Sequence, residues 1–433
     1  MTWARREITG WGRVLRAEAE LARPEKRRAA LALAAEAPCP ALGQRRSYGD
    51  ACLAERALLT DRLDRVLEID LDAGTLTSEA GVRLGDLAQY LAPRGWLPPV
   101  MPGTGFATVG GAIAMDVHGK NHHLKGAFSA HVTRLVLATP HGPVEVMPED
   151  PLFALTAGGL GQTGPILEAT MRLAPVRGDV MMVTERRMTG LEPFCDALDA
   201  SDAPYVVGWI DATATGDTLG RGILEEGEVG KGLVPPAKRG RKIPFDAPRA
   251  ALSAPVVRTF NAAYLRRVPE RGRTVVRPIA DYFFPLDKLF EWNRLYGKHG
   301  FHQFQCVVPV EARPALRDML ERIGKAALAS PLAVLKRLGP GAGHPMSFPM
   351  AGYTLAVDLP NRPGAERLLA TLNAATAEAG GRVYLAKDSS LSAAEAHAMY
   401  PGRAAWAEAV NARDPEHAFE TALVKRLKLR EAA

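Results

Sequence analysis

Residues 102–123 place the strongest constraint on how this chain can fold. The segment reads PGTGFATVGGAIAMDVHGKNHH and holds five glycines, three histidines, a lysine and an asparagine, with no clear helical or strand period. Glycine lets the backbone turn with positive φ and lets its N–H groups approach a ligand closely. The polar end, His118 to His123, adds side chains that hydrogen-bond a ligand or move a proton. The segment therefore predicts an irregular binding loop rather than a core element.

Length and composition narrow the class of protein. A chain of 433 residues predicts two or three domains, and 47% hydrophobic with 24% charged residues is typical of a globular protein. The net charge of +6 is mild, and the basic residues do not alternate with aromatics, so nucleic-acid binding is not indicated. A phosphate-bearing substrate or an anionic membrane surface fits this charge equally well.

Cysteine usage and hydropathy suggest a location. The four cysteines form no CxxC pair, so the sequence predicts no metal site or dithiol chemistry, and scattered thiols suit a reducing compartment. The N-terminal residues contain arginines but no apolar segment before a cleavage site, and no stretch approaches the roughly 18 apolar residues of a membrane span. We expect a cytoplasmic protein whose membrane contact, if any, is peripheral at the inner face.

Two further glycine clusters accompany the first. GQRRSYG at residues 43–49 is typical of an anion-binding nest of backbone N–H groups. GLGQTG at residues 159–164 matches GxGxxG, but Pro165 and an alternating strand follow it where a Rossmann fingerprint needs a helix. Three clusters without a Rossmann or Walker motif predict an extended dinucleotide site in a flavin domain of another type.

The pattern of predicted elements changes near residue 176. The first 175 residues predict short strands and helices in an α+β unit that holds all three clusters. Beyond it, expected strands at 181–188, 205–211, 303–310 and 353–358 and expected helices at 314–327 and 368–379 include two strand–helix–strand units. Residues 227–255, rich in Gly, Pro, Lys and Arg, predict a mobile excursion.

These motifs carry a resemblance to a known family. RSYGD at 46–50, the 102–123 segment and GGLGQTGPI at 158–166 resemble the vanillyl-alcohol-oxidase, or PCMH-type, FAD-binding oxidoreductases. More narrowly, the chain resembles the decaprenylphosphoryl-β-D-ribose 2-oxidases. That likeness continues in FFPLDKLFEWNRLYG at 283–297, GFHQFQCVVP at 300–309, LKRLGP at 335–340 and YLAKDS at 384–389.

The resemblance implies a fold and a division of the chain. It implies an α+β, two-domain PCMH-type FAD-binding fold whose second, substrate domain combines an antiparallel sheet with helices. We expect the FAD-binding domain at 1–178, the substrate domain at 179–381, and a C-terminal segment at 382–433 that returns to the FAD domain.

The resemblance also implies site residues. The residues expected to line FAD are Gly43, Arg46, Ser47, Tyr48, Gly49, Gly103, Thr104, Thr108, Gly110, Gly111, Ala112, His118, Gly119, Asn121, Ile166 and Tyr384. The residues expected on the substrate side are Lys120, Trp209, Gln303, Gln305 and Lys336, with Lys387 and His118 as catalytic groups. Either of these two can act as the base that takes the hydroxyl proton while hydride passes to flavin N5. Trp209 fits core packing equally well.

Several positions depart from the family pattern. Arg45 stands where the family usually has glycine, which leaves the geometry of that loop open. Tyr48 takes the place where many relatives carry a histidine bonded to the flavin, so we expect non-covalent FAD. Ala356, Phe283 and Thr354 replace a cysteine, a tyrosine and an asparagine facing the same pocket.

The implied activity is oxidation of the 2′-hydroxyl of a polyprenylphosphoryl-β-D-ribose to a ketone. A separate short-chain reductase would complete epimerisation to the arabinose form, a cell-envelope arabinan precursor. The main alternative is an FAD oxidase of a free sugar, alditol or aldonolactone. The alternative from a different functional class is a binding protein that keeps this fold without catalysing a reaction, and the retained HGKNHH and AKDS motifs argue against it.

Overall fold

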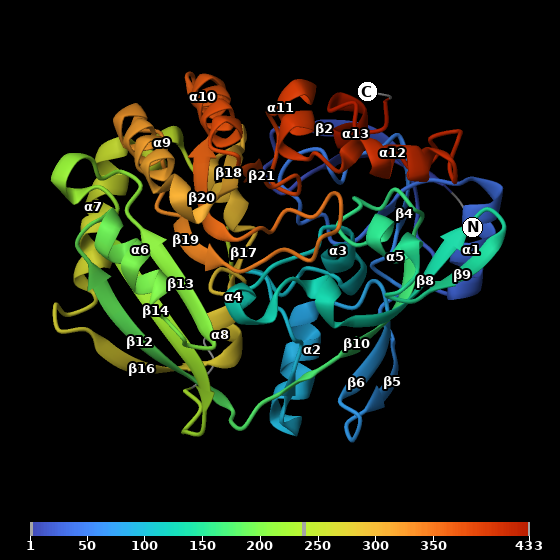
Figure 1. Ribbon diagram of the computed structural model, residues 1–433, viewed down its shortest axis with the longest axis horizontal. Coiled ribbons are helices and arrows are strands. Elements are labelled where there is room, and N and C mark those ends of the chain that lie inside the picture. The colour runs from blue at the N-terminus through green and yellow to red at the C-terminus, as the bar shows by residue number, and fades with distance from the viewer. Residues whose placement is uncertain (1–2, 236–239, 432–433) are drawn as a thin grey trace.

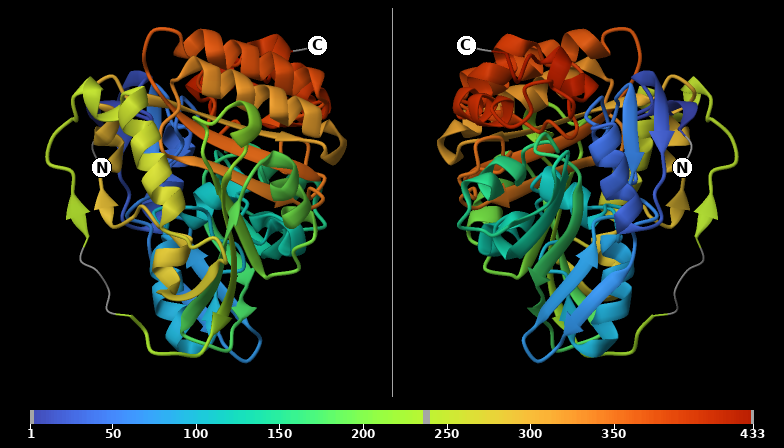
Figure 2. Two further views of the ribbon diagram at one scale, coloured as in Figure 1. Left: turned by 90° about the vertical axis from the view of Figure 1, so that its left-hand side faces the viewer. Right: turned by 90° about the vertical axis from the view of Figure 1, so that its right-hand side faces the viewer.

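The computed structural model describes residues 3–235 and 240–431. Two lobes lie side by side, and the helices nearest the C-terminus form a row along one edge of both (Figures 1 and 2). Among the described residues, no helix is both long and apolar enough to cross a bilayer. The α+β class predicted from the sequence is confirmed.

The first lobe contains a four-stranded and a five-stranded sheet. The four-stranded sheet has the order β1–β2–β4–β3, from β1 (Ala4–Thr9), β2 (Arg16–Ala22), β3 (Ala41–Leu42) and β4 (Arg56–Leu59). The five-stranded sheet has the order β5–β6–β10–β8–β9, from β5 (Val66–Asp70), β6 (Thr75–Glu79), β8 (Val132–Thr139), β9 (Gly142–Val146) and β10 (Ile166–Arg172). Its helices are α1 (Arg27–Glu36), α2 (Leu84–Leu91), α3 (Val109–Ala114), α4 (His122–Lys125) and α5 (Pro151–Thr156). β10 directly follows the GxGxxG loop, as the sequence predicts.

The 102–123 segment is more regular than its composition predicts. Val109, Ala112 and Ile113 are fully buried in the core of the first lobe, on one face of α3. Thr108 caps this helix, because its hydroxyl accepts a hydrogen bond from the backbone N–H of Gly111 at 3.2 Å. The expectation of an irregular loop throughout is therefore wrong for these residues. Their i, i+3, i+4 spacing was the available signal, and the glycines on the other face concealed it.

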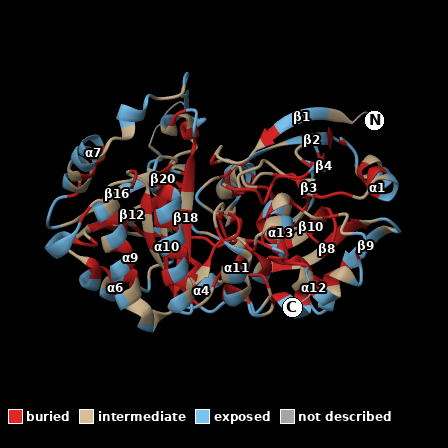
Figure 3. Ribbon diagram, turned by 90° about the horizontal axis from the view of Figure 1, so that it is seen from above, coloured by how far each residue is buried: buried red, intermediate tan, exposed pale blue. Residues whose placement is uncertain are grey.

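The second lobe is built on one antiparallel sheet of eight strands. Its order is β16–β12–β14–β13–β19–β20–β18–β21. The strands are β12 (Val180–Met188), β13 (Tyr205–Ile210), β14 (Gly222–Gly230), β16 (Arg273–Pro278), β18 (Phe301–Val308), β19 (Ala333–Leu338), β20 (Gly352–Pro360) and β21 (Arg382–Val383). Phe194, Leu320 and Leu372 pack on Phe304 and Leu355 in the core of this lobe. Figure 3 shows the buried residues concentrated along β18 and the strands around it.

Three helices cover one face of the eight-stranded sheet. They are α6 (Leu191–Asp199), α9 (Arg313–Ala326) and α10 (Ala365–Glu378). The helices predicted at 314–327 and 368–379 are present between strands, as β18–α9–β19 and β20–α10–β21, but the strand that follows α9 is β19 and not the predicted strand at 353–358. Strands β14, β16 and β19 were not predicted. The opposite face of the sheet is turned toward the first lobe.

The segment from 227 to 255 is partly regular. Its first residues complete β14, and β15 (Arg241–Lys242) pairs in parallel with β17 (Leu289–Phe290). Residues 236–239 lie outside the described residues. The predicted excursion therefore does not begin at 227, because the pairing of β14 with β12 and β13 extends through that residue.

Further elements of the two lobes are β7 (Trp96–Leu97), β11 (Ala174–Pro175), α7 (Ala254–Arg266) and α8 (Ile279–Phe283).

The last 50 or so residues lie against both lobes. They form α11 (Ala393–Met399), α12 (Arg403–Asn411) and α13 (Ala422–Arg426). The Trp406 indole donates to the backbone carbonyl of Leu155 at 3.1 Å, and Arg426 bridges the buried carboxylates of Asp50 and Asp388. This segment thus contacts the first lobe, while the boundaries at 178 and 381 stay predictions.

Candidate active site

A cavity of about 980 Å³ lies between the two lobes. All three glycine clusters contribute to its wall: residues 43–48, residues 102–104 and Gly161 are among the lining residues. The facing wall is the inner surface of the eight-stranded sheet. The clusters that lie far apart in the sequence therefore meet at one site.

Strand register decides which side chains of the sheet face the cavity. Gln303 pairs with Asp358, and Gln305 pairs with Ala356, across β18 and β20. Ala356 pairs in turn with Val334 of β19, which pairs with Trp209 of β13. Because side chains alternate along a strand, these paired positions share one face. Lys336, two residues beyond Val334, joins that face opposite Thr354.

Two lysines with lowered pKa values stand at this face. Burial lowers the pKa of Lys387 to about 7, with a further lowering from the charge of Lys336 against the opposing effect of Asp358. Burial also lowers the pKa of Lys336 to about 8. The Lys387 ammonium lies 3.7 Å from the centre of the Tyr48 ring, so it sits between the two lobes. Among the described residues, neither lysine makes an ion pair.

His118 is held as a neutral imidazole. It is buried beside the rings of Phe348 and Tyr384, with centroid distances of 5.4 Å to each. Its Nε2 lies 3.1 Å from the amide nitrogen of Gln305, while its Nδ1 has no partner among the described residues. Burial, with the charge of Lys336, places the pKa of His118 well below its ordinary value. The ring therefore fixes the Gln305 amide without carrying a charge.

Asp358 is a site residue that the sequence analysis missed. Its carboxylate is 0% exposed, accepts a hydrogen bond from the Gln303 amide and another from the Tyr296 hydroxyl at 2.9 Å. Burial raises its pKa to about 7. The signal was present: Asp358 is the one charged residue in the strand sequence GYTLAVDLP. The position alone could not show that it faces the amide of Gln303.

The first glycine cluster is fixed by stacking and by an unusual backbone conformation. The Arg46 guanidinium lies 4.1 Å from the Trp11 ring and 4.4 Å from the Phe106 ring, and burial lowers its pKa to about 10. Its Nε has no partner among the described residues. Arg45 adopts φ of +50°, the left-handed region that glycine favours. The loop thus keeps the glycine-type backbone although the residue has a side chain.

The Gly103 loop is pinned by the second lobe. Asp287 accepts hydrogen bonds from the Thr104 hydroxyl at 2.8 Å and from the Gly105 N–H at 2.6 Å. A Cβ added at Gly103 or at Gly161 would meet nothing within 4 Å, so both glycines border open space in the cavity. The sequence analysis did not identify Asp287 as a residue of the site.

Most of the predicted site residues line the cavity, and five do not. Those lining it are Gly43, Arg46, Ser47, Tyr48, Gly103, Thr104, Thr108, Gly111, His118, Gly119, Lys120, Trp209, Gln303, Gln305, Lys336, Tyr384 and Lys387. Those outside its lining are Gly49, Gly110, Ala112, Asn121 and Ile166. Two of these glycines pack against other parts of the protein. A Cβ added at Gly110 would lie 2.8 Å from the Ala80 side chain, and a Cβ added at Gly49 would lie 1.8 Å from the Asp388 carbonyl oxygen. Asn121 is buried, donates to the Pro99 carbonyl at 2.9 Å and leaves its Oδ1 without a partner among the described residues.

Lys120 and Trp209 both line the cavity but are anchored elsewhere. The Lys120 ammonium donates to the backbone carbonyl of Tyr282 and lies 3.8 Å from the centre of the Tyr282 ring. Burial lowers its pKa to about 7. The Trp209 indole N–H donates to the Pro331 carbonyl at 2.8 Å. Trp209 is half-buried, so part of its side chain remains available to the cavity.

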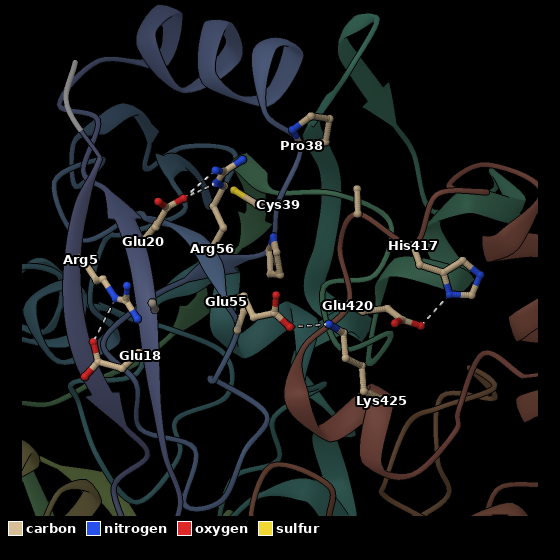
Figure 4. A pocket seen from close by; sticks show the side chains of 14 residues that line it. Arg5, Glu18, Glu20, Pro38, Cys39, Glu55, Arg56, His417, Glu420 and Lys425 are labelled. Atoms are coloured by element: carbon tan, nitrogen blue, oxygen red, sulfur yellow. Dashed lines mark hydrogen bonds and ion pairs between the residues drawn. The ribbon is translucent and has the colours of Figure 1, made fainter.

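A second depression, of about 600 Å³, lies on the surface near the N-terminal strands (Figure 4). Its charged side chains are already paired with one another: Arg5 with Glu18, Arg56 with Glu20, Lys425 with Glu55 and His417 with Glu420. Exposed ion pairs of this kind are typical of a solvated surface. We place no active site there.

The cavity fits FAD. Its wall contains residues of all three glycine clusters, and the Nε of Arg46 has no partner among the described residues. The lining carries seven lysines and arginines against four carboxylates: Arg45, Arg46, Lys120, Lys242, Arg277, Lys336 and Lys387 against Glu225, Asp287, Glu291 and Asp358. Positive lining and backbone N–H groups are what a pyrophosphate requires. The fold and site define an FAD-binding oxidoreductase, and a family model for an FAD binding domain matches residues 17–147.

The chain belongs to the decaprenylphosphoryl-β-D-ribose oxidase family. It is 35% identical over 409 residues to the decaprenylphosphoryl-β-D-ribose oxidase of Mycolicibacterium smegmatis, covering 90% of this chain and 89% of that protein. It is also 32% identical to an uncharacterized protein of Streptomyces coelicolor, over 80% of this chain and all of that one. Similarity to the D-arabinono-1,4-lactone oxidase of Eremothecium gossypii, at 29% identity, covers only 31% of this chain and 26% of that enzyme.

Proposed function

We propose that this enzyme oxidises the 2′-hydroxyl of a polyprenylphosphoryl-β-D-ribose to a ketone. The observation that carries the proposal is the cavity wall beside the glycine clusters. There two amides stand with two lysines that make no ion pair among the described residues, in a chain similar over 90% of its length to a decaprenylphosphoryl-β-D-ribose oxidase. A carbon that becomes a ketone loses a hydride and its hydroxyl loses a proton. FAD, when bound, supplies the hydride acceptor.

Lys387 is the residue we assign as the base. Its pKa of about 7 makes the neutral amine available near neutral pH, and a neutral amine can take the hydroxyl proton. His118 has a pKa well below its ordinary value, and its Nε2 faces the Gln305 amide. His118 therefore holds Gln305, and Lys387 moves the proton.

The neighbouring side chains have the chemistry to hold the substrate. Gln303 and Gln305 point from one face of β18 and present amides that hydrogen-bond sugar hydroxyls. Asp358 orients Gln303, and His118 orients Gln305. Lys336 is a cation without an ion-pair partner among the described residues, and it is our choice for the phosphodiester, with Lys120 as a second contact.

The cofactor set follows the same reasoning. We propose that FAD is held by the predicted residues that line the cavity, namely Gly43, Arg46, Ser47, Tyr48, Gly103, Thr104, Thr108, Gly111, His118, Gly119 and Tyr384. Because Tyr48 offers a phenol rather than an imidazole, we propose that the attachment is non-covalent. We further propose that the enzyme acts at the cytoplasmic side and passes its keto product to a separate reductase.

An anaerobic reduction experiment tests the proposal. Purified FAD-loaded enzyme is mixed with a short-chain polyprenylphosphoryl-β-D-ribose, and separately with free ribose, xylitol and an aldonolactone, while the absorbance of the oxidised flavin is followed. We expect bleaching by the lipid-phosphate sugar alone. Bleaching by the free polyol or the lactone would replace the proposal with the alternative oxidase class, which the partial likeness to lactone oxidases favours weakly. Lys387→Ala should keep FAD and lose the bleaching.

A further inference from the structure

Three aromatic side chains form a row from the inside of the cavity to the surface. The Trp209 ring on β13 lies 4.7 Å from the Tyr264 ring on α7, and Tyr264 stacks on Phe260 with ring centroids 5.8 Å apart and an angle of 15°. All three line the cavity. Phe260 is 50% exposed and Val256, one helical turn away on the same face, is 48% exposed. Figures 1 and 3 show α7 at the outer margin of the second lobe.

An open row of this kind needs an explanation. Burying Phe260 and Val256 would be favourable, yet Phe260 stays half exposed in the lining of the cavity and Val256 stays half exposed beside it on α7. Leu289 and Phe290 also line this cavity, and Phe290 is 46% exposed. The row therefore has the properties of a groove for an extended apolar ligand that continues into the cavity.

The order of chemistry along the wall identifies that ligand. Strand pairing runs from Gln305 and Ala356 to Val334 and then to Trp209, with Lys336 beside Val334 on β19. Crossing the sheet thus leads from the amides of β18 over Ala356 of β20 to β19, where Lys336 and Val334 lie two residues apart on the same face, and then to Trp209 and the aromatic row. A polyprenyl-phosphate sugar has the same order along its length: sugar, phosphate, hydrocarbon chain.

We propose that the groove formed by Trp209, Tyr264, Phe260 and Val256 is the binding path of the polyprenyl chain. The inference rests on the proposed function and deepens it, because it gives the lipid part of the substrate a defined place. The first isoprene units lie on Trp209 and Tyr264, and later units leave over Phe260 and Val256. Flat aromatic faces and methyl-branched alkenes pack well without any hydrogen bond. Recognition here increases with chain length, whereas recognition of the sugar does not.

The dependence of binding on chain length tests the path. The half-saturating concentration for anaerobic flavin reduction is measured with a single-isoprene and with a farnesyl phosphoryl-β-D-ribose, both below their micelle concentrations. In the unaltered enzyme we expect the farnesyl compound to saturate at a concentration about tenfold lower, as the burial of two more isoprene units against half-exposed side chains implies. Phe260→Ser should reduce this ratio by about fivefold, because half of one large aromatic contact is removed.

A matched variant separates the path from general effects. Tyr90 on α2 is 46% exposed and does not line the cavity, so Tyr90→Ser makes the same type of change on a helix elsewhere and should keep the ratio. Val256→Ser provides a second reading, with a smaller expected reduction, should Phe260→Ser fail to retain FAD. An unchanged ratio in the two groove variants, or an equal change in Tyr90→Ser, overturns the proposal. If neither lipid-phosphate sugar bleaches the flavin in the unaltered enzyme, the proposed function itself fails.

Discussion

The pH dependence of flavin reduction is the sharpest consequence of the site geometry. With a pKa of about 7, Lys387 is about 10% neutral at pH 6 and about 90% neutral at pH 8. If the neutral amine takes the hydroxyl proton, the rate at saturating substrate rises about ninefold between these pH values and is then flat. A lysine with an ordinary pKa near 10.4 would instead give a rate that continues to rise about tenfold per pH unit up to pH 10. Anaerobic stopped-flow reduction by farnesylphosphoryl-β-D-ribose measures the profile.

Two variants assign the profile to Lys387. Lys387→Arg keeps the positive charge but cannot release a proton near neutral pH, so the rise should disappear and the rate should fall about a hundredfold or more. Asp358→Asn removes the negative charge that raises the pKa of Lys387, and it also removes the titration of Asp358 itself, whose pKa is about 7, so the rise that remains belongs to Lys387 and should move to lower pH. His118 has a pKa well below its ordinary value and should not titrate in this range. A rate in the unaltered enzyme that is flat from pH 6 to 8, or a rise retained by Lys387→Arg, would refute the assignment.

Three further predictions concern the scaffold. Arg426→Met should lower the free energy of unfolding in urea by about 3 kcal/mol, because it leaves the buried carboxylates of Asp50 and Asp388 without their partner. The control Arg317→Met loses only an exposed ion pair with Glu192 and should change the free energy of unfolding little. Arg45→Gly and Arg45→Val both remove a positive charge from the cavity lining, but Arg45→Val should weaken the affinity for FAD further, because glycine adopts φ of +50° freely and a β-branched residue does not; titration of apoprotein with FAD compares the two variants. Denaturation in detergent should release all of the flavin to the filtrate, because Tyr48 stands where relatives attach it; retained yellow colour would contradict non-covalent binding.

Local patterns predicted the parts of the fold that local interactions determine. The helix α10 ends at Glu378 before Gly380, which adopts φ of +68°, and the glycine pair was a readable stop signal. Strand β16 was missed because it lies at the edge of the sheet, where Thr274 and Val276 on one face are exposed and no residue of the strand is fully buried. The helix α3 was missed because glycines on its far face lower helix propensity, and only the packing of Val109 and Ile113 into the core offsets that cost.

The sequence by itself determined the class of protein, because the flavin-type glycine clusters and the HGKNHH segment are local and specific. It also named Lys387, Gln303 and Gln305 as candidates. Only the tertiary structure decided that Asp358 joins them and that the pKa of Lys387 lies near 7. The pKa shift of Lys387 depends on burial by both lobes and on the charges of Asp358 and Lys336, which are distant along the chain. No pattern within one segment contains that information.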